Sequence, residues 1–289
     1  MDYSISFPNL HIHFSHVPKT FMIGSLSIAM YGVIIAIGML LGVRLVLSEG
    51  KRQGIKEDDF IDIAIWALVF SIIGARLYYV AFSWDLYKDN LLEIFNLRAG
   101  GLAVYGGVIA GVITGFVVCR IKKLNFLQCA DIAMLGVLVG QILGRWGNFF
   151  NREVFGGYTN NIFAMQLPIS AIRSMSDVTT EMLDNAITIG DEVYISVHPT
   201  FLYESIWNLV LLLILYYLIR NKKRFDGEIL CLYASGYGLG RFWIEAVRTD
   251  RLYIANTNIA VSQLLAGILV VAGIIGLIFG LEKTSAKNK

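Results

Sequence analysis

The 289-residue sequence is poor in charged residues and in cysteine. Charged side chains make up 16% of the chain, whereas they make up about a quarter of a typical soluble domain. Hydrophobic residues make up 56%, which is more than one soluble core buries, so most of them are expected to face lipid. The net charge of +2 is too small for a protein that binds a nucleic-acid backbone. We therefore expect an integral membrane protein that binds no nucleic acid.

The three cysteines, Cys119, Cys129 and Cys231, form no paired framework and show no CxxC spacing. The sequence therefore indicates neither a disulfide scaffold nor a zinc site, and we interpret these residues as small apolar packing residues. A cleavable signal peptide is not predicted. Residues 1–20 are mixed polar, and the apolar stretch after them is too long for the hydrophobic region of a signal.

Seven apolar stretches are long enough to cross a membrane, since a helical span takes about 20 mostly apolar residues. They are Phe21–Leu47, Phe60–Phe82, Leu102–Cys119, Asp131–Phe149, Phe201–Ile219, Ile229–Val247 and Ile259–Leu281. The predicted fold is an all-α polytopic membrane protein, with residues 1–289 as one membrane domain. An odd number of spans places the two termini on opposite sides of the membrane.

Basic residues decide which side is cytoplasmic, because cytoplasmic loops carry an excess of Lys and Arg. The loops after the first, third and fifth predicted spans, and the C-terminal tail, hold most of the Lys and Arg outside the spans. These residues are Lys51, Arg52, Lys56, Arg120, Lys122, Lys123, Arg220, Lys222, Lys223, Arg224, Lys283, Lys287 and Lys289. The C-terminus is therefore predicted to be cytoplasmic and the N-terminus external.

Residues 151–200 form one long connection between the fourth and fifth predicted spans, on the external side. Connections of this length are usually functional or separately structured. Ser176–Ala186 is expected to form a short helix, and Glu192–Val197 alternates like a strand. We interpret residues 151–200 as a small external head.

Four arginines lie inside the predicted spans: Arg44, Arg76, Arg145 and Arg241. Arg44 is near a cytoplasmic end, where its side chain can reach the membrane surface. Arg76 either pairs within the protein or contacts a lipid head group. Arg145 and Arg241 lie near the external ends of their spans. An intramembrane arginine costs at least about 2.5 kcal/mol unless it is paired or solvated, so both are candidates for a functional role.

Polar stripes accompany these two arginines along their predicted helices. Residues three or four positions apart share one helix face, and the two stripes are Gln141, Arg145 and Asn148, and Tyr233, Tyr237, Arg241 and Glu245. Such stripes line a cavity or a helix contact. Two guanidiniums at the membrane boundary suit the phosphate of a lipid head group, which they bind through forked donors. The alternative is that each arginine pairs with a carboxylate, for instance Arg241 with Glu245.

The segment His198-Pro199-Thr200-Phe201-Leu202-Tyr203-Glu204 adds a third polar group at the external boundary. His198 acts there as a base or a hydrogen-bond donor, or else it is a structural histidine. Glu204 lies inside the predicted span, so we expect it to pair with one of the arginines.

Residues 144–156, GRWGNFFNREVFG, resemble the signature of prolipoprotein diacylglyceryl transferases, G-R-x-G-N-F-x-N-x-E-x-x-G. The resemblance extends to Tyr31-Gly32 and to residues 100–107, GGLAVYGG. It also includes residues 198–204 and the sixth predicted span from Tyr237 to Arg248. Seven predicted spans with an external N-terminus also agree, so the resemblance covers essentially the whole chain.

The resemblance implies a transferase of the bacterial cytoplasmic membrane that works without a metal or an organic cofactor. Its reaction moves the diacylglyceryl group of phosphatidylglycerol to the lipobox cysteine thiol of a prolipoprotein. The products are a thioether-linked lipoprotein precursor and glycerol 1-phosphate.

The resemblance also implies the site residues. The expected catalytic residues are Arg145, Arg241, Tyr105 and His198. The residues expected to bind phosphatidylglycerol are Arg145, Tyr31, Gly101, Asn148, Asn151, Glu153, Gly156, Glu204, Tyr237, Glu245 and Arg248.

One position departs from the family pattern. The glycine-rich segment often reads HGG, with the histidine proposed as the base, whereas this chain has Tyr105-Gly106-Gly107. A tyrosine titrates near pH 10, so it is a poor base near pH 7. Either His198 takes the role of the base, or the arginines suffice and Tyr105 donates a hydrogen bond. We favour the second alternative.

A transporter of an anionic substrate is the main alternative function. Transporters usually show broken helices or paired half-repeats, and no internal repeat is evident in the sequence. An intramembrane serine protease is disfavoured, because Tyr233-Ala234-Ser235-Gly236 lacks the first glycine of a GxSG nucleophile turn.

Overall fold

The structure is a computed structural model that describes residues 4–97, 100–254 and 257–287. The chain divides into two compact units. The first unit consists of Met1–Gly42 and Met134–Lys289, and the second unit is Val43–Ala133.

Helices make up most of both units. They are α1 (Met30–Arg52), α2 (Glu57–Phe82), α3 (Val104–Ile121), α4 (Phe126–Asn151), α5 (Thr180–Asp184), α6 (Thr200–Leu213), α7 (Glu228–Val247) and α8 (Val261–Lys287). Helix α6 continues as a π-helix over Ile214–Ile219, and short 3-10 turns occupy Pro8–Leu10, Trp84–Leu86, Leu91–Phe95, Ile169–Ala171 and Met175–Asp177. The strands are β1 (Ile5–Phe7), β2 (Ile12–Phe14), β3 (Thr20–Ile23), β4 (Leu26–Ala29), β5 (Met165–Pro168), β6 (Ile187–Ile189) and β7 (Glu192–Val197).

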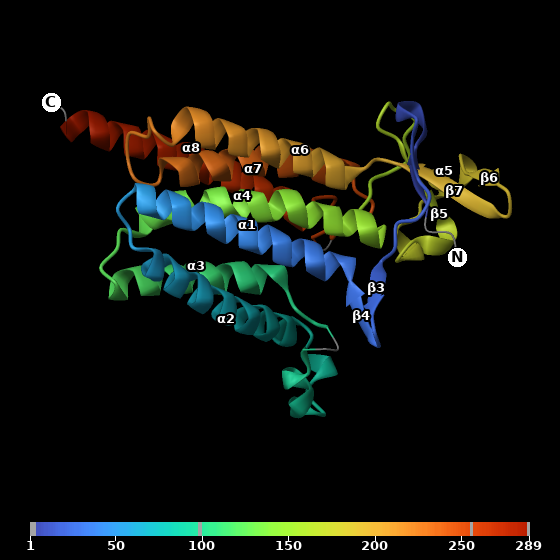
Figure 1. The fold of residues 1–289 in the computed structure, drawn as a ribbon, viewed down its shortest axis with the longest axis horizontal. Coiled ribbons are helices and arrows are strands. Elements are labelled where there is room, and N and C mark those ends of the chain that lie inside the picture. The colour runs from blue at the N-terminus through green and yellow to red at the C-terminus, as the bar shows by residue number, and fades with distance from the viewer. Residues whose placement is uncertain (1–3, 98–99, 255–256, 288–289) are drawn as a thin grey trace. The chain divides into compact units, whose positions relative to one another are not determined.

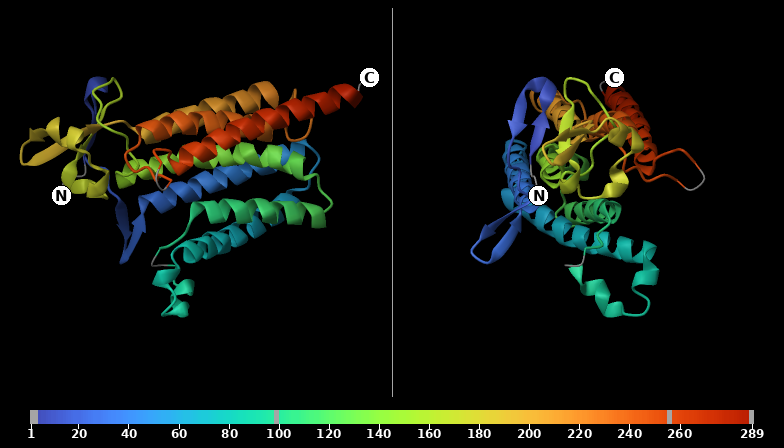
Figure 2. Two further views of the ribbon diagram at one scale, coloured as in Figure 1. Left: turned by 180° about the vertical axis from the view of Figure 1, so that it is seen from behind. Right: turned by 90° about the vertical axis from the view of Figure 1, so that its right-hand side faces the viewer.

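In the first unit, α6, α7 and α8 run beside the first-unit parts of α1 and α4 (Figures 1 and 2). Direct hydrogen bonds connect the helices: Ser205 Oγ of α6 donates to Ile142 O of α4 at 3.1 Å, and Trp207 Nε1 donates to Gly236 O of α7 at 2.8 Å. Helices α7 and α8 approach closely at Gly238, where a Cβ would lie 2.7 Å from Ala266 O. Small residues permit this approach, as is common between membrane helices.

A small head lies at the end of this bundle where α4 ends and α6 begins (Figure 1). Its antiparallel sheet has the order β2-β1-β5-β7-β6. Strand β5 pairs with β7 from Met165↔Val197 to Pro168↔Tyr194. The buried core beneath the sheet includes Ile5, Phe7, Leu167, Ile195 and Met182.

Two local elements were predicted within residues 151–200. The strand Glu192–Val197 is β7, residue for residue, whereas the expected helix Ser176–Ala186 is shorter and forms α5. The head was predicted from residues 151–200 alone, but strands β1 and β2 complete its sheet. The chain is mostly helical, as predicted, but the all-α fold class needs correction because the chain also forms β-strands.

The predicted start of the first span was also wrong. Residues predicted as the beginning of Phe21–Leu47 form the β3–β4 hairpin, and α1 begins only at Met30. Gly24 has a φ of +61° at the turn of this hairpin, a conformation that glycine adopts without strain. The apolar run from Phe21 therefore contains two short strands before the helix.

Each of the seven predicted spans overlaps a helix, and six of these helices are long and apolar enough to cross a membrane. They are Met30–Arg52, Glu57–Phe82, Val104–Ile121, Phe126–Asn151, Thr200–Ile219 and Val261–Ala286. Helix α7 is 20 residues long and includes Glu228, Arg241 and Glu245. It is not among the six, so its predicted role as a span stays a prediction.

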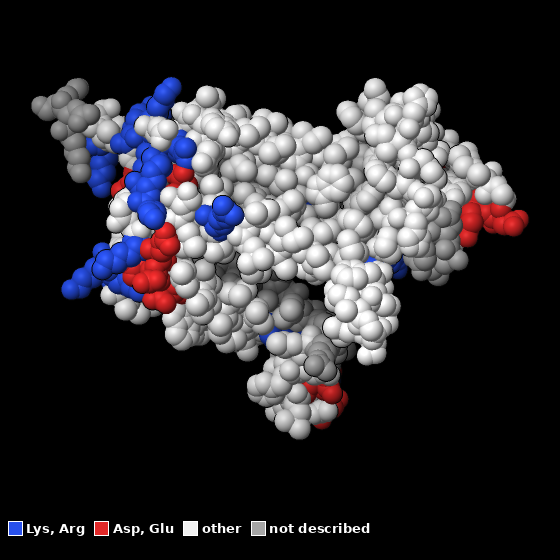
Figure 3. Space-filling view, in the orientation of Figure 1, with Lys and Arg blue, Asp and Glu red and all other residues white. Residues whose placement is uncertain are grey.

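The outer surfaces of the long helices are apolar. Leu40 of α1 and Phe279 of α8 are 71% and 67% exposed. On the face shown in Figure 3, the sides of the helices are largely free of charged side chains, and basic side chains gather where α8 ends. This pattern is that of a multi-pass membrane protein.

In the second unit, α2 packs along α3. Cys119 and Cys129 lie in a buried apolar cluster with Ile55, Phe60 and Ile132, which confirms their interpretation as packing residues. Arg76 of α2 is only 5% exposed. It donates hydrogen bonds to the carbonyl oxygens of Glu93, Ile94, Asn96, Gly100 and Gly101. The structure therefore confirms that Arg76 pairs within the protein, rather than the alternative of contact with a lipid head group.

Candidate active site

The first unit brings together three charged residues from three helices. Glu204 of α6 is 3% exposed. Its Oε1 lies 2.7 Å from Nη2 of Arg145 on α4, and its Oε2 lies 3.1 Å from Nη1 of Arg241 on α7. The expected pairing of Glu204 is confirmed, and it involves both arginines rather than one.

The row of charges continues along α7 and beyond its end. Arg241 Nη2 lies 2.5 Å from Glu245 Oε2, which confirms that predicted pair, and Arg248 Nη1 lies 3.5 Å from the same oxygen. Arg248 also donates to both carboxylate oxygens of Asp250, at 2.8 and 2.6 Å. Burial favours the neutral carboxyl of Asp250, but these hydrogen bonds and the charge of Arg248 outweigh it and lower the Asp250 pKa.

Positive and negative groups therefore alternate through six residues, which we call the charge chain: Arg145, Glu204, Arg241, Glu245, Arg248 and Asp250. Each carboxylate offsets part of the cost of placing a guanidinium away from bulk water. A guanidinium has five N–H donors. Arg145 therefore has more donors than its contacts with Glu204 and Asn148 use. The charge chain can hold an anion while remaining nearly neutral by itself.

A second group of polar contacts forms where α4 ends. Asn148 and Asn151 both donate side-chain hydrogen bonds to Glu153 Oε1, at 3.0 and 3.1 Å. Arg152 and Val154 have φ values of 52° and 61°. This left-handed backbone turns the chain just after the helix, so Glu153 points back at Asn148. Arg173 of the head pairs with the other carboxylate oxygen of Glu153.

His198 lies just before α6, beside Gly156. The Gly156 amide donates to His198 O at 2.9 Å. A Cβ at Gly156 would lie 2.6 Å from Val247 O and 2.8 Å from His198 Cβ, so only glycine fits between these segments. His198 Nδ1 lies 3.1 Å from the Tyr203 hydroxyl. Burial lowers the pKa of His198, which keeps its imidazole neutral near pH 7.

The segments that carry these residues also match known proteins. The family model described as prolipoprotein diacylglyceryl transferase matches residues 18–279. The chain belongs to the prolipoprotein diacylglyceryl transferase family. It is accordingly a transferase of lipoprotein biosynthesis and a multi-pass bacterial membrane protein.

Relatives within this family are similar over nearly their whole length. A phosphatidylglycerol–prolipoprotein diacylglyceryl transferase of Finegoldia magna is 42% identical over 255 residues, which are 88% of this chain and 92% of the relative. The corresponding protein of Clostridioides difficile is 40% identical over 269 residues, or 93% of this chain and 96% of the relative.

The remaining predicted residues lie in different parts of the fold. Tyr31 of α1 packs over Gly147, where a Cβ would lie 2.5 Å from the tyrosine ring. Tyr237 stacks on Tyr233, with ring centroids 5.6 Å apart, and Gln141 Nε2 donates to the Tyr233 hydroxyl at 2.8 Å. The two polar stripes therefore meet inside the bundle.

Tyr105 and Gly101 belong to the second unit. Gly101 has a φ of +78°, and its carbonyl accepts a hydrogen bond from Arg76 at 2.9 Å. Tyr105 follows at the start of α3 and is 39% exposed. Their predicted roles in this transferase family stay predictions.

Sequence reasoning missed Arg173 and Asp250 as partners of site residues. Arg173 lies 20 positions from Glu153 in an irregular segment of the head, so no helix or strand spacing connects the two. Asp250 lies only two positions after Arg248, just beyond the end of α7. This short spacing could have indicated the pair from sequence.

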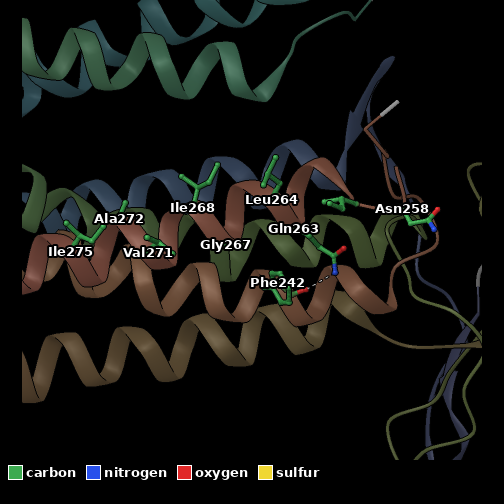
Figure 4. Close-up of a pocket in the computed structure, with 10 residues that line it drawn as sticks. Phe242, Asn258, Gln263, Leu264, Gly267, Ile268, Val271, Ala272 and Ile275 are labelled. Carbon is green, nitrogen blue, oxygen red and sulfur yellow. Dashed lines mark hydrogen bonds between the residues drawn. The ribbon is translucent and has the colours of Figure 1, made fainter. Parts of the chain in front are cut away.

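The described part of the first unit contains an apolar pocket and a polar one. An apolar pocket of about 690 Å³ runs along α8, where it is lined mainly by aliphatic side chains between Ile259 and Ile275 (Figure 4). At its polar end, Gln263 Nε2 donates to Phe242 O at 3.4 Å. The other pocket, of about 500 Å³, is polar and is lined by His198 and Arg248. Within residues 4–97, 100–254 and 257–287, no group of three or more His, Cys, Asp and Glu is placed to hold a metal ion.

Proposed function

We propose that this chain transfers the diacylglyceryl group of phosphatidylglycerol to the lipobox cysteine thiol of prolipoproteins. The products are a thioether and glycerol 1-phosphate. One observation carries the proposal: in a chain of this family, the Glu204 carboxylate forms salt bridges with both Arg145 and Arg241. The names of the relatives supply the two substrates.

The reaction exchanges one bond at a glyceryl carbon for another. The bond between that carbon and the phosphate oxygen breaks, and its electron pair stays on the phosphate. The thiol sulfur forms the new C–S bond and loses its proton. Negative charge therefore grows on the phosphate as the reaction proceeds, and fixed positive charge beside it lowers the barrier.

Arg145 and Arg241 supply this charge. Both guanidiniums stay protonated at any physiological pH and present forked donors to phosphate oxygens. Glu204 fixes their separation before substrate arrives, so little reorganisation is needed during the reaction. Glu245 and Arg248 extend the same charge chain and support Arg241.

The head group of the lipid is oriented by the polar groups around Arg145. Asn148 connects Arg145 to Glu153, and Asn151 donates to the same carboxylate. Tyr31, Tyr237, Gly101 and Gly156 complete the proposed binding set. Gly156 acts through close packing against His198 rather than through a side chain.

The thiol is reactive as its thiolate, so a base or nearby positive charge must favour loss of its proton. We propose that the arginines provide this effect and that Tyr105 donates a hydrogen bond to phosphate or substrate. His198 is the competing candidate for the base. Its lowered pKa leaves it neutral and able to accept a proton.

The site is proposed to face the outside of the cytoplasmic membrane, with the N-terminus external and the C-terminus cytoplasmic. Basic residues follow the end of α6 and lie near the end of α8, as expected for cytoplasmic ends. The head then lies outside, where exported prolipoproteins arrive.

The direct test uses the purified full-length protein in phosphatidylglycerol vesicles with a lipobox peptide. We expect loss of the peptide thiol together with release of glycerol phosphate. A transporter of an anionic substrate would produce neither signal, so this experiment also decides against the alternative function.

A further inference from the structure

The polar pocket lies where the head meets the end of α7. Its volume is about 500 Å³. The head contributes Thr180 and Glu181, and the segments next to α6 and α7 contribute His198, Arg248 and Arg251. All of these residues belong to the first unit, and all lie outside the long helices.

This pocket adjoins the charge chain through a shared residue. Arg248 lines the pocket, and its Nη1 lies 3.5 Å from Glu245 Oε2, which itself contacts Arg241. His198, the candidate base, lines the pocket as well. Two residues of the charge chain, Arg248 and Glu245, therefore connect a molecule in this pocket to Arg241.

The lining offers both hydrogen-bond donors and acceptors. Arg251 donates, the Glu181 carboxylate accepts, and the Thr180 hydroxyl does both. Arg248 already donates to Asp250 and pairs with Glu245. A phosphate group only accepts, and the negative charge of Glu181 offsets the attraction of Arg251 for it. An acyl chain can form no hydrogen bond. A polypeptide suits this lining best, because every peptide unit presents one donor and one acceptor.

The position of the pocket also fits one part of the protein substrate. The apolar signal segment of a prolipoprotein belongs in the bilayer, and its acceptor cysteine must reach the arginines. The residues that follow the cysteine must then leave the membrane beside the end of α7, where the pocket lies.

On this basis, and resting on the proposed function, we propose that this pocket binds the residues of the prolipoprotein that directly follow the acceptor cysteine. Arg251 and Glu181 hold the peptide backbone or its polar side chains. The pocket thus selects for the beginning of the mature protein, in addition to the selection of the lipobox itself.

The test compares two peptides that share the same apolar segment and lipobox. One ends with an amide at the acceptor cysteine, and the other continues for four further polar residues. For the full-length protein in phosphatidylglycerol vesicles, we expect kcat/KM to be about tenfold higher with the longer peptide, as for one or two charge-assisted hydrogen bonds. Equal use of the two peptides would overturn the inference.

Glu181→Gln and Arg251→Gln should each reduce this preference severalfold, mainly through KM for the longer peptide. Asp191→Asn is the matched control, because it removes one carboxylate from the β6–β7 turn of the head, outside the pocket lining. The control should retain the wild-type preference.

Two further outcomes count against the inference in different ways. Variants that raise KM for phosphatidylglycerol, with the peptide preference intact, would assign the pocket to the lipid head group. Absence of transfer with both peptides would instead overturn the proposed function, and this inference with it.

Discussion

Glu204 holds Arg145 and Arg241 through the two oxygens of a single carboxylate, at 2.7 and 3.1 Å. The three residues come from α4, α6 and α7. One buried anion therefore fixes the spacing of two cations that stand more than 90 positions apart in sequence.

Arg145→Ala and Arg241→Ala should each lose nearly all transfer, a fall of about 10²–10³ in kcat, because each removes a charge that stabilises the leaving phosphate. Lysine at either position should rescue poorly, since it cannot bind phosphate in the forked manner of arginine. Thiol loss from a lipobox peptide measures the effect, with Arg44→Ala as the control. Normal lipidation by either alanine variant would refute the mechanism.

Glu204→Gln keeps the shape of the side chain but leaves two guanidiniums without their shared anion. Breaking a buried pair in this way typically costs about 3–5 kcal/mol, so thermal unfolding in detergent should occur at a clearly lower temperature. Transfer should fall as well. Asp191→Asn is the control, and equal unfolding temperatures for the two variants would count against the structural role of Glu204.

Gly156→Ala places a methyl group 2.6 Å from Val247 O. Overpacking of this kind costs about 1–3 kcal/mol, and it displaces His198, so both stability and transfer should fall. Gly140→Ala in α4 is the matched control, because no atom lies within 4 Å of the Cβ that it adds. If the two substitutions had the same effect, close packing would not be the reason for glycine at 156.

Tyr105→Phe removes only a hydroxyl. If Tyr105 donates a hydrogen bond, the variant should retain partial transfer activity, because the arginines still stabilise the phosphate. Steady-state rates with phosphatidylglycerol and a lipobox peptide measure this. Complete inactivation would point to an acid–base role for the hydroxyl.

His198 should make stability depend on pH in one direction. Burial lowers its pKa in the folded protein, so the unfolded chain binds the proton at a higher pH, near the ordinary histidine pKa of about 6.5. The contribution of a neutral, buried His198 to the free energy of unfolding is complete above that pH. It is lost progressively as the pH falls below it. Unfolding temperatures of the wild type and His198→Gln, measured from pH 8 to 5, should therefore converge at acid pH. A constant difference would contradict the burial argument.

The ion pairs of the charge chain were partly predictable from sequence, because charged residues are rare in apolar stretches. Arg145, Arg241 and Glu245 lie on polar faces of apolar helices, and the cost of such charges in lipid implies partners. The pairing of Glu204 with both arginines required the packing of three helices, which no spacing within a single helix encodes. The sequence predicted that Glu204 pairs with one of the arginines, but not that both arginines share it.

The β-structure was harder to predict for a different reason. Strand β7 shows its alternation locally, but β1 pairs with β5 about 160 positions away, at Ser6↔Gln166. The β3–β4 hairpin lies in an apolar run that continues into α1, and short apolar strands are difficult to distinguish there from the first turns of a helix. Arg173 likewise reaches Glu153 only through the folded head.

Helix α7 carries Arg241, Glu245 and, at its start, Glu228, and its composition sets it apart from the six more apolar helices. A charged residue in a membrane helix opposes insertion most strongly at the helix centre, where the cost is about 2.5–3.5 kcal/mol. During synthesis, α7 is therefore expected to enter the bilayer together with α6, which brings Glu204, and with α8, which covers its Gly238 face. On the proposed function, the charges that stabilise the leaving phosphate would thus also favour insertion of α6, α7 and α8 as a group.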